Sequence, residues 1–73
     1  MLALILANVE LGEEEKVEKS ILEISEVEEA YQVYGLYDIV IKVKFEEKEK
    51  LRNIVLRIRA IKGIRSTMTL IIM

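Results

Sequence analysis

Apolar residues occupy every second position from Ile39 to Phe45, and lysines fill two of the positions between them. This period of two predicts a strand with one buried face. The segment Leu2–Val9 is apolar at almost every position, which is typical of a central strand covered on both sides. Two further strands are expected over Val27–Tyr34 and Ile64–Ile72. The Glu28–Glu29 pair in the first of these favours the edge of a sheet, where charge discourages further pairing.

Apolar residues at helical spacing predict two helices. The first is expected over about Glu13–Ser25, directly after Gly12, and its opening glutamates suit the positive end of a helix dipole. The second is expected over about Glu47–Lys62, with Gly63 at the position of a C-terminal cap. The apolar positions that define the two faces are Val17, Ile21 and Ile24 in the first helix and Leu51, Ile54, Val55, Ile58 and Ile61 in the second.

The predicted order of elements is strand–helix–strand, followed by strand–helix–strand. Right-handed crossovers join such units into a ferredoxin-like α+β fold, a four-stranded antiparallel sheet with both helices on one face. Residues 1–73 then form a single domain, with the strands at 2–9 and 39–45 in the middle of the sheet. The helix-free face would carry either the odd-numbered set from Ala3 to Val9 or its even-numbered partner. Monomers rarely expose such an apolar face, so we expect dimerisation through it.

Composition also favours an assembly of several copies. The chain has 73 residues, 52% of them apolar, and no cysteine. Domains of this size bury only about 60% of their unfolded surface, and without disulfides a common supplement is oligomerisation. We therefore expect an obligate oligomer. The charged residues are almost all Glu, Lys and Arg, a bias that resembles thermophile usage.

The sequence favours a cytoplasmic protein, because no signal peptide is evident and no apolar run approaches the ~20 residues of a membrane helix. The net charge of −2 argues against direct nucleic-acid binding. Residues 1–36 carry nine acidic and two basic groups (net −7), whereas residues 37–73 carry four acidic and nine basic groups (net +5). Two solvated helix faces of opposite sign explain this asymmetry. Head-to-tail complementarity between subunits is the alternative.

The side chains that carry most catalytic chemistry are missing. The chain contains no histidine and no cysteine, which removes the commonest general base, a common nucleophile and the usual transition-metal ligands. No Gly-rich phosphate loop is present, and the central strands lack the paired aromatic residues of an RNA-binding sheet. We expect a protein that is not an enzyme and that uses no metal or other cofactor.

The residues around Gly35 are candidates for binding. Gly35 can adopt positive φ and lets the backbone approach a ligand, although an ordinary hairpin turn is the simpler explanation. Tyr34 and Tyr37 flank it, either as walls of a small pocket or as a cap on the core. Asp38 is the only aspartate; it satisfies turn amides in one interpretation and holds an ammonium group in the other.

Thr67 and Thr69 share one face of the last strand. They either reflect the preference of threonine for strands or contact a ligand. Two motifs occur in order along the chain, Gly35-x-Tyr37-Asp38 and Gly63-Ile64-x-x-Thr67-x-Thr69. They resemble the effector-binding RAM module of the Lrp/AsnC (feast/famine) transcriptional regulators, and the resemblance spans essentially the whole chain. Full-length members carry an N-terminal helix-turn-helix domain. Because this chain begins directly in the first strand of the module, it resembles a stand-alone version.

The resemblance implies ferredoxin-like subunits that dimerise through their sheets and dimers that assemble into rings. It also implies free amino acids as effectors, held between dimers by backbone amides near Gly35, by Asp38 and by threonine hydroxyls. Family members usually have a small hydroxyl residue at the position of Tyr34 and a polar or acidic residue at that of Leu36, so this pocket is expected to favour an apolar amino acid. Carried over by position, the ligand-binding residues are Tyr34, Gly35, Leu36, Tyr37, Asp38, Thr67, Met68 and Thr69.

Two classes of function follow from the resemblance. In the first, the chain binds an amino acid and modulates transcription indirectly, by co-assembling with a full-length Lrp/AsnC regulator. In the second, it is an assembly module without a ligand, or a small-molecule carrier of the related ACT type. An enzyme of the dimeric α/β-barrel kind is a third, more distant alternative, disfavoured by the absence of histidine.

Overall fold

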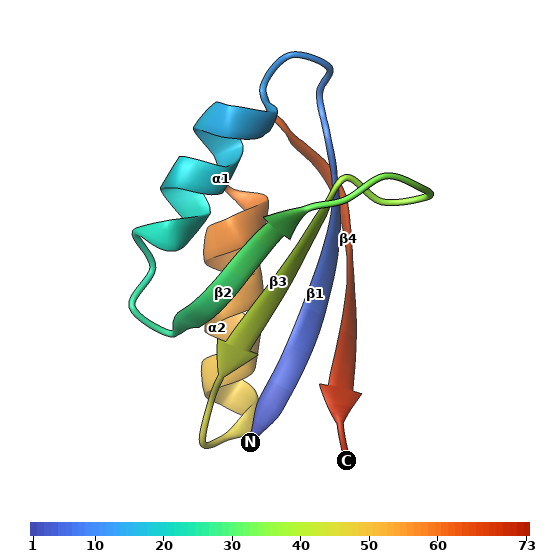
Figure 1. Cartoon of the computed structure of the whole chain (residues 1–73). Helices are drawn as coiled ribbons and strands as arrows, with labels where there is room; N and C mark the ends of the chain where they lie inside the picture. Colours follow the sequence, from blue (N-terminus) through green and yellow to red (C-terminus); the bar gives the residue numbers. More distant parts are fainter.

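The computed structural model describes residues 1–73 as four strands and two helices in the order β-α-β-β-α-β (Figure 1). Both helices lie on the same side of the sheet, and the ferredoxin-like α+β fold expected from the sequence is confirmed. The elements are β1 (Leu2–Val9), α1 (Glu14–Leu22), β2 (Val27–Gln32), β3 (Ile39–Lys44), α2 (Lys48–Arg59) and β4 (Ile64–Ile72).

The sheet has the strand order β2-β3-β1-β4, and every neighbouring pair is antiparallel. β1 and β3 therefore lie in the middle, and β2 lies at an edge, as its glutamates predicted. Across the sheet, Ala7 of β1 lies between its partners Ile39 on β3 and Thr67 on β4. This pairing fixes which side chains share a face across the whole sheet.

The odd-numbered residues of the two central strands point toward the helices and form the core. Ala3, Ile5 and Ala7 of β1 have no exposed surface, and the apolar faces of the two helices cover them. The remaining buried residues are Val9, Val17, Ile21, Ile24, Ile39, Ile41, Val43, Phe45, Leu51, Ile54 and Ile58. The even-numbered set of β1 thus lies on the helix-free face, which settles the choice that the sequence left open.

The helices end earlier than the periodicity predicted, because the chain tightens into shorter hydrogen-bonded turns. After Leu22 the amide of Ile24 donates to the carbonyl of Ile21, an i→i−3 bond that closes α1 in place of a further α-helical turn. α2 ends at Arg59 with the same type of hydrogen-bonded turn. The expected C-terminal cap at Gly63 is therefore wrong, since that residue lies in the turn before β4.

Glycine is required at position 63 for a different reason, because α1 packs closely against this turn. Gly63 has a φ of 105°, and a Cβ placed on it would lie 2.9 Å from Cγ2 of Val17 and 3.2 Å from Cβ of Glu13. Its carbonyl also accepts the amide of Glu10 at 2.7 Å. A side chain at this position would push α1 away from the turn that leads into β4.

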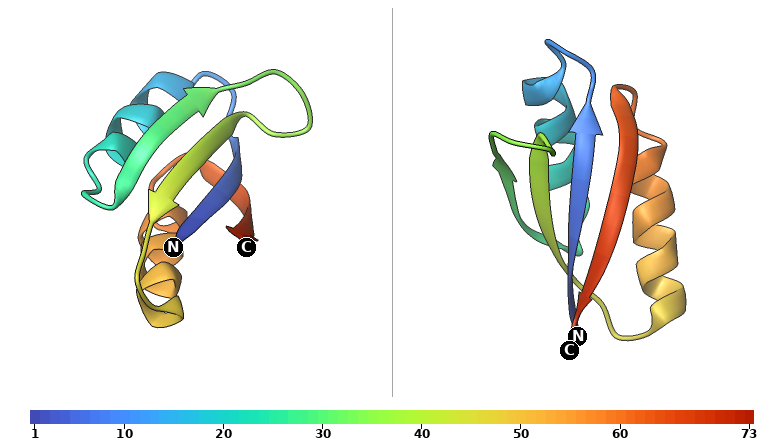
Figure 2. Two further views of the ribbon diagram at one scale, coloured as in Figure 1. Left: turned by 60° about the horizontal axis from the view of Figure 1, so that its bottom comes forward. Right: turned by 90° about the vertical axis from the view of Figure 1, so that its right-hand side faces the viewer.

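The helix-free face of the sheet faces the viewer in the right panel of Figure 2. Apolar side chains from β1 and β4 lie on it in cross-strand pairs: Leu2 with Ile72, Leu4 with Leu70, and Leu6 with Met68. The β4 members of these pairs remain between 44% and 47% exposed. Neither helix is long and apolar enough to cross a membrane.

Candidate functional site

The loop between β2 and β3 is anchored at its base and free at its tip. The amide of Val33 donates to the carbonyl of Asp38 at 2.9 Å, and the amide of Asp38 donates to the carbonyl of Ala7 at 2.9 Å. These bonds end β2 at Gln32, two residues before the predicted end. The loop projects beyond the sheet (Figure 1), and the side chains of Tyr34 and Leu36 at its tip are fully exposed.

Asp38 fixes the loop to the end of the central strand. Its Oδ2 accepts the backbone N–H of Val9 at 2.8 Å, so the carboxylate satisfies an amide at the point where the β1–β4 register shifts. The other carboxylate oxygen accepts no hydrogen bond from the chain. Asp38 is therefore a structural residue that keeps one oxygen available.

Tyr37 connects the loop to β4. Its hydroxyl donates to Sδ of Met68 at 3.4 Å, which places the ring beside the helix-free face of the sheet. The thioether is a weak acceptor, so the contact works mainly through packing. Tyr37, Asp38 and Met68 are the predicted site residues that the fold brings to one corner of the molecule.

Thr67 and Thr69 lie on the opposite face. They are paired with Ala7 and Ile5, whose side chains are buried under the helices, and period two places both threonines on that same side. Both are half-buried, whereas Met68 between them faces the helix-free side. The structure therefore separates the two threonines from Tyr37 and Met68 within one subunit.

A hollow of about 270 Å³ opens beside Asp38, at the end of β1. It is lined by Asn8, Asp38, Arg65 and Ser66, and Nδ2 of Asn8 donates to Oγ of Ser66 at 3.1 Å. One carboxylate and one guanidinium thus face a small polar space, an arrangement that matches the two charged ends of a zwitterion. Sequence reasoning missed three of these four residues. Among these three, Asn8 could have drawn attention to the hollow, because it is the one polar residue inside an apolar strand.

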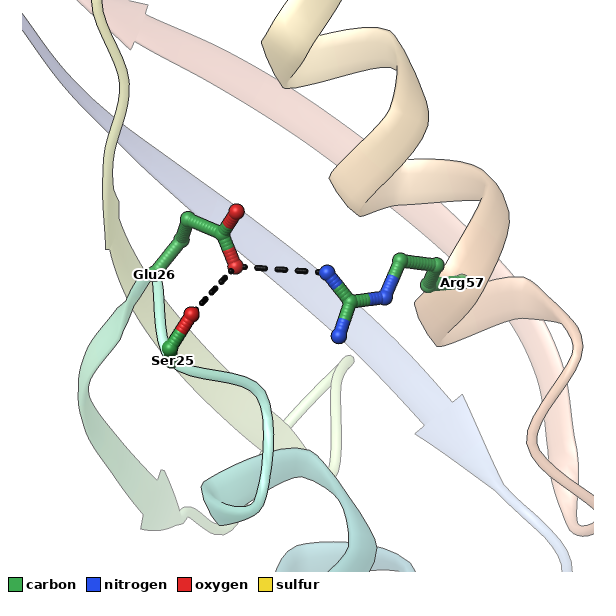
Figure 3. A network of polar contacts seen from close by, with 3 residues as sticks. All are labelled: Ser25, Glu26 and Arg57. Atoms are coloured by element: carbon green, nitrogen blue, oxygen red, sulfur yellow. Dashed lines mark hydrogen bonds and ion pairs between the residues drawn. The ribbon is translucent and has the colours of Figure 1, made fainter.

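A second hollow, of about 380 Å³, lies at the other end of the sheet between the α1–β2 turn and the start of α2. Beside it, Oε1 of Glu26 accepts hydrogen bonds from Ser25 at 3.1 Å and from Arg57 at 3.3 Å (Figure 3). Its own backbone amide and then the Ser25 hydroxyl, with a smaller contribution from Arg57, hold the pKa of Glu26 below its ordinary value. This cluster joins the α1–β2 turn to α2, and we give it a structural role. No group of three or more acidic side chains is arranged to hold a metal ion.

Comparison with known proteins agrees with the fold. FFRP-DM1, a crystal structure, superposes with a TM-score of 0.93 at 36% identity over 99% of this chain and 97% of that chain. A feast or famine regulatory protein from M. tuberculosis, solved in complex with L-methionine, superposes with a TM-score of 0.82 at 26% identity, covering 97% of this chain and 48% of that one.

Curated relatives include longer transcriptional regulators, which match this chain over its whole length. The HTH-type transcriptional regulator FL11 of Pyrococcus horikoshii is 34% identical over 73 residues, which are 100% of this chain and 48% of the regulator. The chain thus spans about half the length of these regulators. Homocitrate synthase of Sulfolobus acidocaldarius is 39% identical over 57 residues, 78% of this chain but only 12% of the enzyme.

The family model described as the Lrp/AsnC ligand binding domain matches residues 2–73. This match covers the motifs around Gly35 and Gly63 that first suggested the resemblance. The curated relatives that match the whole chain, the FL11 proteins of three Pyrococcus species, are transcriptional regulators. The chain therefore belongs to the Lrp/AsnC ligand-binding domain family.

Proposed function

We propose that this chain binds a free amino acid beside the β2–β3 loop and that binding is coupled to assembly with further copies or with a full-length Lrp/AsnC regulator. The observation that carries the proposal is the hollow at the end of β1, where Asp38 and Arg65 face the same space. The family membership and the L-methionine complex of a relative at 26% identity support an amino acid as the ligand.

The charges of the hollow suggest how the ligand lies. The free oxygen of Asp38 receives the α-ammonium group, and the guanidinium of Arg65 receives the α-carboxylate as a charge-assisted hydrogen bond. Tyr37 precedes Asp38 in the chain and contacts Met68, two residues after Ser66 on β4, and we assign these two side chains as an apolar wall beside the polar hollow. An apolar amino acid fits this wall best, in agreement with the expectation from Tyr34 and Leu36.

The remaining loop residues are assigned to a neighbouring subunit. The side chains of Tyr34 and Leu36 are fully exposed, so within one subunit they enclose nothing; a second dimer that covers them would close the site and would gain stability from the bound ligand. Thr67 and Thr69, on the other face, contact no ligand held by their own subunit in this arrangement. They are available to a ligand presented by the adjoining dimer.

Calorimetric titration with each of the twenty amino acids tests the proposal. We expect heat with at least one apolar amino acid, lost in Arg65→Met but retained in the matched variant Arg52→Met, which removes an exposed arginine from α2. A light-scattering measurement of mass with and without that ligand tests the coupling to assembly. If none of the twenty binds, the sensor function is wrong.

The second candidate, an assembly module without a ligand, is favoured by the apolar helix-free face alone. That face offers a contact whether or not the hollow is filled. A chain that assembles but binds no amino acid would have this function.

A further inference from the structure

The two edges of the sheet differ in how they are protected against pairing with another strand. β2 is short, its register shifts between Val27 and Glu29, and Glu28 and Glu29 place charge on it. Short length, bulges and charged side chains are the devices by which natural edge strands avoid further pairing. β4 lacks all three along most of its outer edge. It is the longest strand of the sheet and carries one charged residue, Arg65, near its start.

The outer edge of β4 therefore presents a row of backbone groups that no strand of the subunit pairs. β4 is hydrogen-bonded to β1 on one side only. In the right panel of Figure 2 it is the outermost strand of the sheet, and α2 lies beside it. Every second residue of an edge strand directs its N–H and C=O outward. A long apolar edge of this kind is a template for a further strand.

Helix α2 adds positive charge beside this edge. Arg57 reaches Oε1 of Glu26 in the α1–β2 turn at 3.3 Å, so its side of the helix is the one that faces α1. Arg52 and Arg59 lie about 140° and about 200° away from Arg57 around the helix, at roughly 3.6 residues per turn. They therefore lie on the side away from α1, toward β4, against which α2 packs. Lys48 precedes Arg52 by one helical turn and belongs to the same row.

The row of Lys48, Arg52 and Arg59 has no negative partner within the subunit, because the ion pairs of the chain involve only Lys42 and Arg57. Like charges one turn apart destabilise a helix, and a lysine in the first turn also opposes the helix dipole. The dipole accounts for Arg59 in the last turn but for neither Lys48 nor Arg52. An acidic partner would remove the repulsion between these two cations.

We propose that β4 and α2 together bind an extended acidic segment of a partner protein, which pairs with the outer edge of β4 as an additional strand. Alternate side chains of such a strand point to opposite faces of the sheet. The set on the helix side meets the cations of α2 and consists of Asp or Glu. The other set lies beside Met68, Leu70 and Ile72, which are half-exposed, and is apolar. Backbone hydrogen bonds provide affinity, and the alternation of acidic and apolar residues provides specificity.

A second copy of this chain fits the edge of β4 less well. Two β4 strands paired with each other bring the cationic rows of two α2 helices to the same junction, where like charges repel. The β2 edge is acidic, but its register shift and short length leave few backbone groups aligned for pairing. The inference goes beyond the proposed function, since it does not depend on whether the hollow beside Asp38 binds an amino acid.

Fluorescence anisotropy with a labelled peptide of four Val-Glu repeats, capped at both ends, tests the proposal on the full chain. We expect saturable binding that weakens as salt is added, and no binding of the corresponding Val-Lys peptide. The double variant Arg52→Gln, Arg59→Gln should weaken binding by about 5-fold or more. The matched double variant Lys16→Gln, Lys19→Gln removes the same charge from exposed positions of α1 and should change binding by less than about 2-fold.

Two N-methylated peptides test the backbone part of the contact. Methyl groups on the valine nitrogens or on the glutamate nitrogens block one edge or the other of the extended peptide, and at least one of the two forms should lose binding. Retention in both forms would leave only charge attraction to α2 and would overturn the additional strand.

Other outcomes overturn the acidic partner. A Val-Glu peptide that does not bind, that binds no better than the Val-Lys peptide, or that binds the arginine variant as well as the wild type would contradict recognition by the α2 cations. A second copy that already holds the edge would be displaced by the peptide. A fall in the mass measured by light scattering when the peptide is added would therefore assign the edge of β4 to a contact between subunits instead.

Discussion

The carboxyl group of Asp38 accepts a structural hydrogen bond and is also proposed to hold the ammonium group of a ligand. Two substitutions separate these roles. Removing the side chain in Asp38→Ala leaves the Val9 amide without the acceptor it has at 2.8 Å, so we expect a loss of about 1–3 kcal/mol in the free energy of unfolding. Asp38→Asn keeps an acceptor and should cost less than half of this, but it removes the negative charge proposed to hold an ammonium group. Urea unfolding at fixed protein concentration and amino-acid titration measure the two effects. Equal stability losses in both variants would contradict the structural task.

Gly63 and Gly12 form a matched pair at the residue scale. Both have positive φ, 105° and 88°, so an alanine at either site strains the backbone by about 1–3 kcal/mol. Only at Gly63 would the new Cβ meet atoms, 2.9 Å from Val17 and 3.2 Å from Glu13. We expect Gly63→Ala to cost at least about 1 kcal/mol more than Gly12→Ala, because overpacking adds to strain. Thermal unfolding measures both, and equal costs would show that α1 moves freely.

At the scale of elements, alternation in the sequence predicted the strands well because period two is a local property. It also placed Thr67 and Thr69 on a common face. Which face that is depends on pairing with Ala7 and Ile5 of a distant strand, and a one-residue shift in register would reverse it. The sequence could therefore not show that Met68, rather than the threonines, adjoins Tyr37.

The hollow at the end of β1 was hidden from the sequence for the same reason. Arg65 and Ser66 belong to no motif, and Asn8 joins them only through the β1–β4 register. The helix ends were overestimated because apolar periodicity continues through Ile24 and Ile61, which are packed by turns rather than by helix. Hydrogen-bonded turns of this kind leave no periodic signal.

The turn between α1 and β2 should respond to acid through Glu26. Its pKa is lowered from 4.5 in the folded chain, so the stability that it provides is present above the unfolded pKa and is lost as the pH falls through the lower folded value. We expect wild type to exceed Glu26→Gln in unfolding free energy at about pH 7 and this difference to shrink at about pH 3. Urea unfolding at both values checks it. A difference that grows on acidification would mean that the carboxylate destabilises the turn.

At the scale of the whole molecule, core and surface apolar residues have different tasks. Only 14 of 73 residues are buried, while the cross-strand pairs of β1 and β4 on the helix-free face leave Met68, Leu70 and Ile72 half-exposed. A small domain gains little from its own core, so covering this apolar face is the natural source of additional stability. The hollow proposed to bind the ligand lies at one end of the same two strands. Ser66 lines the hollow, and Met68, two residues further along β4, belongs to the apolar pairs, so the two features share this strand.

The stability of the whole chain should therefore depend on its concentration. For a two-state dimer, a tenfold rise in total protein raises the stability by about 1.4 kcal/mol, which moves the melting temperature of a domain this small by several degrees, roughly 3–8 °C. We expect this slope in wild type and its absence in Leu70→Lys, whose melting temperature should be the same at all concentrations. A saturating amino acid should raise the wild-type melting temperature at every concentration. A wild-type melting temperature independent of concentration would contradict a folded state stabilised by its partner, because mass action requires the slope whenever folding and association are coupled.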